Sequence, residues 1–181
     1  MRKRFIMTAF GKDRMGFIAD VARVIYENGC SLEDSTMTRL SDEFAMIFLV
    51  EGQEDPSLRG SLLDRLSTEC RRLEMERGIS AFVRPLSSTT PKSEGDATLH
   101  TLHVEGLDQV GIVYKISRYL ADHGINITHF ESKCRPSPQT GAAMYTIDLN
   151  FEMPAKIQWR ALEEGLNQIS NELNVDILLK A

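Results

Sequence analysis

Two short loops of the sequence repeat the same combination of glycine and aspartate. The first is Gly11-Lys12-Asp13-Arg14-Met15-Gly16, and Gly106-Leu107-Asp108-Gln109-Val110-Gly111 follows 95 positions (106 − 11) later. Apolar residues at helical spacing come next in both copies, so each loop is expected to lead into the N-terminus of a helix. The unpaired N–H groups and the positive dipole end of such a terminus suit a carboxylate. The glycine at the end of each loop has no Cβ, so a ligand can approach the backbone there.

The binding of an α-amino acid fits this chemistry. Asn126, at the start of the strand after the second repeated helix, has an amide that can both donate and accept hydrogen bonds, as an α-amino acid requires. The first copy has Ser31 at this position, a shorter group with one donor, so its site is expected to be degenerate. Short, glycine-containing loops favour a small amino acid, and glycine and serine are the first candidates for the ligand. The candidate ligand-binding residues are Asp13, Arg14, Met15, Gly16, Phe17, Ile18, Ser31, Asp108, Gln109, Val110, Gly111, Ile112, Val113, Asn126 and Ile127.

Purely structural roles explain some of these residues equally well. Asp13 and Asp108 are of the type that caps helix N-termini or forms turns. Asn126 could simply cap a strand turn. Gly29 and Gly124 follow the two repeated helices and are expected to be their C-terminal caps. A structure is therefore needed to separate ligand contacts from local folding signals.

The repeat extends well beyond the loops, because the offset of 95 holds without a gap through the following helix and its terminal glycine. A segment rich in Ser, Thr, Pro and Gly separates the copies, as expected for a linker. We therefore predict a first domain at 1–86, a linker at 87–97 and a second domain at 98–181. Each copy shows the order βαββαβ, which predicts an α+β, ferredoxin-like layer of four antiparallel strands with two helices on one face.

The hydrophobic pattern predicts six elements in each copy. In the first copy these are a strand at 5–10, a helix at 17–28, strands at 31–40 and 44–50, a helix after Pro56 with Leu58, Leu62, Leu66 and Leu73 on one face, and a strand at 79–83. In the second copy they are a strand at 99–104, a helix at 112–123, strands at 125–134 and 143–151, a helix at 156–173 and a strand at 175–179.

The two sheets are expected to differ on the face that the helices leave open. Segment 143–151 alternates between apolar and polar residues, so the second sheet can face water. Segment 44–50 is apolar on both sides, so the open face of the first sheet is expected to be covered, either by the second copy or by a second chain. The residues predicted to lie partly at a chain-chain interface, most simply in a homodimer, are Ile6, Phe10, Phe44, Met46, Phe48 and Val50.

Composition excludes several classes of protein. The chain has 181 residues, 42% of them hydrophobic and 26% charged, as in ordinary soluble domains. Its net charge of −5 argues against direct binding of nucleic acid. Three widely spaced cysteines without a CxxC motif predict free thiols in a reducing compartment, and no metal or other cofactor. No apolar run is long enough for a signal peptide or a membrane span, so a cytoplasmic protein is expected.

Other proteins with this order of elements provide alternatives. An RNA-recognition module would need a basic residue and a glycine before its aromatic strand, where this chain has Asp42 and Glu43. A metal-handling module would need a CxxC motif. A small enzyme of the acylphosphatase type would need a phosphate-binding loop followed by an arginine. The second copy has no arginine before Arg118, which lies within the helix, and the first copy has Arg14 but lacks the other features of such a loop. A regulatory subunit of a metabolic enzyme is a further alternative.

The repeated Gly-x-Asp-x-x-Gly loops, each followed by a helix and then by Asn28-Gly29-Cys30-Ser31-Leu32 or His123-Gly124-Ile125-Asn126-Ile127, resemble the ACT domain. The resemblance covers nearly the whole chain twice. It implies a non-catalytic, amino-acid-sensing protein, with the asparagine contacting the ligand. Two such domains without a catalytic domain resemble ACT proteins that control transcription of glycine metabolism. The partner implied is then a DNA-binding transcription factor.

Overall fold

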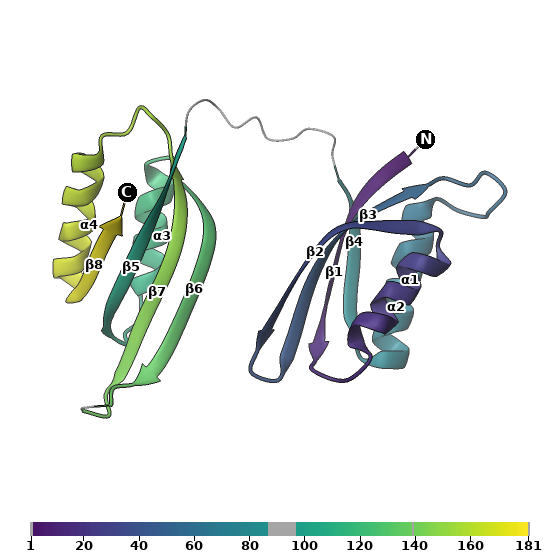
Figure 1. The fold of residues 1–181 in the computed structure, drawn as a ribbon, viewed down its shortest axis with the longest axis horizontal. Helices are drawn as coiled ribbons and strands as arrows, with labels where there is room; N and C mark the ends of the chain where they lie inside the picture. Colours follow the sequence, from purple (N-terminus) through teal and green to yellow (C-terminus); the bar gives the residue numbers. More distant parts are fainter. Residues whose placement is uncertain (1, 87–96, 139, 181) are drawn as a thin grey trace. The chain divides into compact units, whose positions relative to one another are not determined.

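The computed structural model describes residues 2–86, 97–138 and 140–180. The chain divides into two compact units, Met1–Thr90 and Pro91–Ala181, and each is described by itself. The predicted linker at 87–97 lies outside the described residues except for Ala97. In each unit two helices lie on one face of a four-stranded antiparallel sheet (Figure 1). The predicted fold class is therefore confirmed.

Both units have the predicted order of elements. The first contains β1 (Arg2–Lys12), α1 (Phe17–Glu27), β2 (Cys30–Leu40), β3 (Glu43–Gln53), α2 (Leu62–Arg77) and β4 (Ser80–Pro85). The second contains β5 (Thr98–Leu107), α3 (Ile112–Asp122), β6 (Asn126–Pro136), β7 (Ala143–Met153), α4 (Trp159–Leu173) and β8 (Val175–Lys180). The strand orders are β2-β3-β1-β4 and β6-β7-β5-β8, so the first strand of each unit lies in the interior of its sheet. This strand is paired on both sides up to Phe10 in the first unit and up to Gly106 in the second, at the start of each repeated loop.

Helix α2 begins later than the sequence predicted. Ser61 is its N-cap, and the Ser61 side chain and the Asp64 side chain each accept a hydrogen bond from the other residue's backbone N–H. This reciprocal arrangement, a capping box, satisfies two N–H groups that would otherwise lack partners. Leu58, predicted on the apolar face of this helix, consequently lies before it and is about half exposed. The helix starts where its first N–H groups are capped and not directly after the proline.

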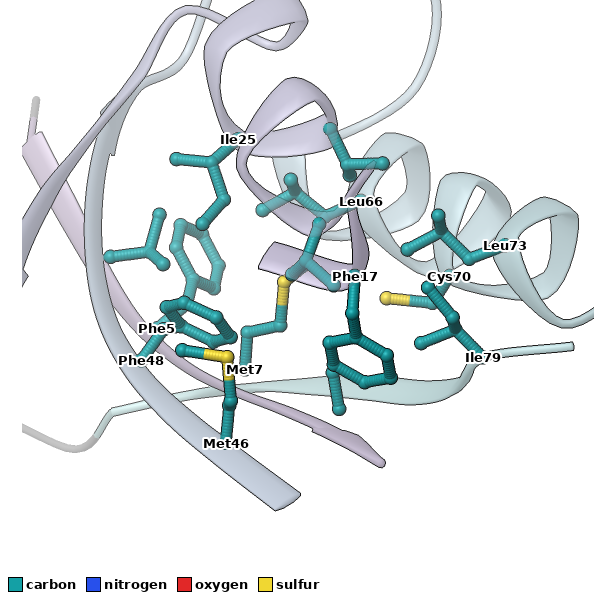
Figure 2. Close-up of a cluster of buried hydrophobic side chains, with 14 of the residues drawn as sticks. Phe5, Met7, Phe17, Ile25, Met46, Phe48, Leu66, Cys70, Leu73 and Ile79 are labelled. Atoms are coloured by element: carbon teal, nitrogen blue, oxygen red, sulfur yellow. The ribbon is translucent and has the colours of Figure 1, made fainter. Parts of the chain in front are cut away.

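The core of the first unit lies between its sheet and its two helices (Figure 2). Phe5, Met7 and Ala9 of β1 point into it, and α2 contributes Leu66 and Cys70. Met46, Phe48 and Val50 of β3 are also buried in this core, and Phe44 packs against it. The prediction that these four β3 residues lie at a chain-chain interface was therefore wrong. A strand that is apolar on both faces gives no sign of which face the helices cover, and successive side chains point to opposite faces.

The second unit has an equivalent core and a different open face. Leu102, Val104, Ile147, Leu149 and Phe151 of the sheet are buried against α3 and α4. The predicted apolar stripe of α4 is confirmed: Leu162, Leu166 and Leu173 are buried, and Trp159 and Ile169 are partly buried against the same core. The opposite sheet face carries polar side chains from all four strands. The predicted contrast between the two sheets thus holds for their open faces.

Candidate functional site

The first repeated loop joins β1 to α1 and is held by contacts from outside the loop. The Asp13 N–H donates to the carbonyl of Asp42 at 2.7 Å, in the turn between β2 and β3. The Asp13 carboxylate accepts a hydrogen bond from Arg39 Nη1 of β2 at 3.1 Å. Asp13 therefore ties the loop to the neighbouring hairpin and does not cap the helix. Sequence analysis missed Arg39, because its contact with Asp13 is formed only by strand pairing.

The second loop, between β5 and α3, is held in a related way. The Asp108 N–H donates to the carbonyl of Ala143 at 2.9 Å, and the Asp108 carboxylate accepts from the thiol of Cys134 at 3.8 Å. Cys134 stands 95 positions after Arg39, so the two loop aspartates contact equivalent positions, one on β2 and the other on β6. The Gln109 amide donates to the carbonyl of Leu173 at the end of α4. The side chain that follows the aspartate thus anchors the second loop to its helical layer.

Both helices begin without a side-chain cap. Gly16 and Gly111 are the N-cap residues, and both have left-handed backbone conformations, with φ of 86° and 103°. Among the described residues, no side chain accepts a hydrogen bond from the first turn of either helix. In α3 the N–H groups of residues 112–114 have no acceptor within the described parts of the chain, and in α1 the same is true of residues 18 and 19. These donors are available to a ligand.

A carboxylate already occupies the first turn of α1. Asp20 is buried, and it accepts hydrogen bonds from Arg14 Nη2 at 2.7 Å and from Arg23 Nη2 at 2.9 Å. The hydrogen bond from Arg14, helped by the charges of Arg77 and Arg23, lowers the pKa of Asp20 against the opposing effect of burial. The Arg14 guanidinium is thereby held beside the loop. The first turn of α3 carries no acidic residue and has Lys115 at the position of Asp20.

Each loop also presents an apolar side chain to solvent. Met15 is 99% exposed and Val110 is 100% exposed. Ile18 and Val113, one turn further along, are partly exposed, whereas Phe17 and Ile112 are buried and anchor the helix starts in the core. Each predicted set of loop residues is therefore brought together around its helix terminus. The exposed members form a small apolar rim beside the free N–H groups.

Asn126 and Ser31 do not join the loops of their own domains. Asn126 pairs with Glu152, which also pairs with Leu99 at the start of β5, whereas the second loop follows Leu107 at its end. Eight residues of strand separate these rows, roughly 27 Å at about 3.4 Å per residue. Ser31 lies in the same way at the Arg4 end of its sheet. The helix returns the chain to the far end, so Asn126 and Ile127 are remote from Gly111.

A shallow cavity lies beside Ser31 at that far end of the first sheet. It has a volume of about 280 Å³, and its lining includes Arg2, Cys30, Ser31 and Glu51. The Ser31 hydroxyl donates to the carbonyl of Glu51 at 3.4 Å. Asn126, by contrast, makes no side-chain hydrogen bond with another described residue and is exposed. The two equivalent positions therefore have different surroundings.

The contacts of the arginines bear on the acylphosphatase alternative. Arg14 is paired with Asp20, and Arg118 is paired with Asp122 one turn along α3 at 2.9 Å. Neither guanidinium is therefore free at its loop to hold a phosphate. Within 2–86, 97–138 and 140–180, no three histidine, cysteine or acidic side chains are grouped so that they could bind a metal ion. No helix in these ranges is long and apolar enough to cross a membrane.

Comparison with known proteins identifies the family. Models of the ACT domain match residues 3–80 and 100–158, one in each unit. The chain is 26% identical over 170 residues to the glycine cleavage system transcriptional repressor of Escherichia coli K12, which covers 93% of this chain and 85% of that protein. It is also 36% identical over 81 residues to a UPF0237 protein of Methanopyrus kandleri, covering 45% of this chain and 86% of the relative.

A solved structure agrees over almost the full length. An unknown protein from Galdieria sulphuraria matches with a TM-score of 0.76 and 26% identity, covering 99% of this chain and 98% of that one. Both family matches include one of the Gly-x-Asp-x-x-Gly loops with its uncapped helix. The chain therefore belongs to the ACT domain family and contains two such domains.

Proposed function

We propose that this protein is a non-catalytic, amino-acid-sensing regulator that controls transcription of glycine metabolism by contacting a DNA-binding transcription factor. The sensing part of the proposal rests on the two loops and on the ACT family. The transcriptional part rests on the similarity to the Escherichia coli protein named as a glycine cleavage system transcriptional repressor. A net charge of −5 favours contact with a protein over contact with DNA itself.

The observation that carries the proposal is the pair of helices that begin at a left-handed glycine without a side-chain cap. A carboxylate at such a terminus accepts hydrogen bonds from free N–H groups and is stabilised by the helix dipole. The second domain offers the better site, because α1 already has Asp20 in its first turn and α3 has no acidic residue there. A small ligand such as glycine or serine suits a loop whose backbone is directly accessible.

A thermal-shift screen of the twenty amino acids tests ligand binding. A ligand that binds only the folded protein at a hundred times its dissociation constant stabilises it by about 2.7 kcal/mol. Because the proposed contact is with the carboxylate, glycine or serine should raise the melting temperature and the corresponding amide, glycinamide or serinamide, should not. Equal shifts with acid and amide, or no shift with any amino acid, would contradict the proposal.

Two glycines of the same helix provide a matched pair of variants. Gly111 precedes α3 and Gly124 follows it; both have positive φ, and a Cβ added at either would meet no atom within 4 Å. Gly111→Ala and Gly124→Ala therefore both strain the backbone without a steric clash, at a cost of roughly 1–2 kcal/mol. Only Gly111→Ala should reduce the shift caused by the amino acid. The same reduction in both variants would mean that the site is not at the loop.

Asn126 is tested separately, because a ligand at the loop of one domain cannot reach Asn126 of the same domain. Asn126→Ala should leave the shift caused by a ligand at the Gly111 loop unchanged. A loss of the shift would show that Asn126, at the far end of the second sheet from Gly111, contributes to the site.

The regulatory step is tested by capturing partners with the immobilised full chain, with and without the amino acid found in the screen. A ligand changes a contact only if it binds the two states unequally. We therefore expect a DNA-binding regulator to be retained in one condition and released in the other. Capture of a metabolic enzyme instead would favour a regulatory subunit. Salt-sensitive retention of the chain itself on heparin would indicate direct binding to nucleic acid.

A further inference from the structure

The open face of the first sheet, which we call the first open face, carries a continuous apolar stripe. Its members are the outward-pointing residues Ile6, Phe10, Ala45, Ile47, Leu49 and Phe82. Phe10 is 45% exposed, Ile47 46% and Phe82 54%, although all three lie within paired strands. Exposed apolar patches of this kind mark interaction sites.

The charges around this stripe are divided between its two halves. Strand register places acidic residues on the β2 and β3 half and basic residues on the β1 and β4 half, at both ends of the stripe. Asp34 and Arg84 lie in one row on opposite edge strands, with Leu49 and Ile6 between them. In the two end rows of the stripe, Glu51 stands beside Arg4, which also pairs with Glu33 at 2.6 Å, and Glu43 stands beside Lys12. In each of these rows an acidic side chain on one side of a line between β1 and β3 therefore faces a basic side chain on the other side.

We propose that the first open face binds the same face of a second copy of this chain, through a twofold axis parallel to the strands and between β1 and β3. This rotation lays β2 over β4 of the other copy and β3 over β1, and keeps each row in line. Asp34 then faces Arg84 twice, Glu51 faces Arg4, and Glu43 faces Lys12. In the centre Leu49 covers Ile6, and Thr36 covers Phe82. Aligned sheets pack about 10 Å apart, and the long arginine side chains can extend across such a gap.

The charges also exclude the other way of stacking two identical sheets. A twofold axis perpendicular to the strands would lay β1 over β1 and β3 over β3 with the rows reversed. It would place Arg4 over Lys12 and Glu51 over Glu43, so that like charges meet at both ends. Like charges across an interface cost several kcal/mol. The distribution of charge therefore selects one of the two geometries.

The equivalent face of the second sheet lacks these properties. Its central row runs through Glu131, Asp148, His103 and Leu178, so three of its four side chains are ionisable. Its central charges are already paired within the unit, His103 Nδ1 with Asp148 at 2.7 Å and Lys133 with Glu131 at 2.6 Å, whereas Asp34 and Arg84 of the first open face form no ion pair with a described residue. Burying this face would desolvate charges without new partners. The charge pattern of the first open face is therefore complementary to a second copy of itself, a property that the second sheet does not share.

The size of the face sets the expected strength of the contact. Four strands about 4.8 Å apart and five rows about 6.8 Å apart cover roughly 500 Å² on each partner. The total of roughly 1,000 Å² is at the low end of specific interfaces. We expect a dimer that dissociates on dilution. This contact is independent of ligand binding.

Charge reversal at the Asp34–Arg84 row provides the test. Neither residue forms an ion pair within the described residues, and both are exposed, so substitution should leave the fold intact. Asp34→Arg and Arg84→Asp each create two repulsive pairs and should raise the dimer dissociation constant about tenfold. The double variant restores both pairs in reversed order and should dimerise like the natural chain. Sedimentation equilibrium over a range of concentrations measures the constant, and circular dichroism confirms folding.

Two controls make the test specific to this face. Asp176→Arg introduces the same change of charge on the open face of the second sheet and should have no effect. Phe82→Asp should abolish the dimer, whereas Leu178→Asp, at an equally exposed site (57%) on the other sheet, should not. A monomer at all concentrations would overturn the proposal. So would single variants that dimerise normally, or a double variant that is no better than the singles.

Discussion

The buried carboxylate of Asp20 provides a quantitative test of how the first loop is held. Asp20→Asn keeps the size of the side chain and removes its charge. The change weakens two hydrogen bonds, from Arg14 at 2.7 Å and from Arg23 at 2.9 Å. Both arginines must then remain next to a neutral amide. The first domain should lose stability while the second domain is unaffected.

The expected size of this loss follows from the exposure of the partners. A hydrogen bond to a charged group contributes about 1.5–3 kcal/mol. The side chains of Arg14 and Arg23 are 36% and 52% exposed, so water recovers part of the loss when the charge is removed. We expect a total of about 2 kcal/mol, which in a domain of this size lowers the melting temperature by about 10 °C.

The effect should also depend on pH, with a definite sign. Because the folded pKa of Asp20 is lowered, chiefly by the hydrogen bond from Arg14, ionised Asp20 favours the folded state. The stabilisation is fully present above the unfolded pKa of about 3.9 and is lost as the pH falls through the lower folded value. The natural chain and Asp20→Asn should therefore differ by a constant amount between about pH 5 and 8 and converge below about pH 4.

Hydrogen exchange read by mass spectrometry, with thermal melts from pH 8 to pH 3, assigns the loss to one domain. Glu172→Gln is the control, because it breaks the exposed Lys115–Glu172 pair of the second domain and should cost less than about 0.5 kcal/mol. Equal losses for both variants would refute the account of Asp20. So would a difference between the natural chain and Asp20→Asn that persists undiminished at pH 3.

Two other contacts of the second loop lead to simple predictions. A Cβ on Gly106 would lie 2.5 Å from Val175 Cγ1 and 3.2 Å from Val175 Cα. Gly106→Ala should therefore destabilise the second domain by about 1–3 kcal/mol, measured as a lower midpoint of urea unfolding. An unchanged midpoint would show that β8 can move away from the added methyl group. Burial and the neighbouring Asp108 raise the pKa of the Cys134 thiol, so Asp108→Asn should increase its rate of reaction with a thiol reagent at pH 8. An unchanged rate would mean that the two side chains are not in contact.

The fold was predictable because its signals are local and occur twice. The apolar residues at helical spacing after Gly16 and Gly111 predict two helices, and the polar segment 41–43 predicts a turn. Each signal can be recognised from the neighbouring residues alone. The start of α2 was missed because the Ser61–Asp64 capping box is a weaker signal than Pro56. The orientation of β3 was missed because Phe44–Val50 is apolar on both faces. Only its packing against α1 and α2 shows which side is inside.

The candidate site was predicted in part, and the limit is one of distance along the chain. The loop residues are neighbours in sequence and remain neighbours in the fold. The role of Asp13 was not visible, because its partner Arg39 lies on another strand. Asn126 was grouped with the loop by resemblance, although the intervening helix α3 carries the chain back along the whole sheet. Contacts between residues on different strands can be predicted only when the pairing register of the sheet is known.

The most direct test of the account is a nuclear magnetic resonance titration of the full chain with glycine and with glycinamide. The account predicts that glycine shifts the backbone amide signals of residues 112–114 most strongly, with smaller shifts at 18 and 19, because their N–H groups are the free donors. Glycinamide should leave these signals in place. Shifts centred on Asn126 and Ser31, equal responses to both compounds, or no response to either would contradict the claim that the uncapped helices bind a carboxylate.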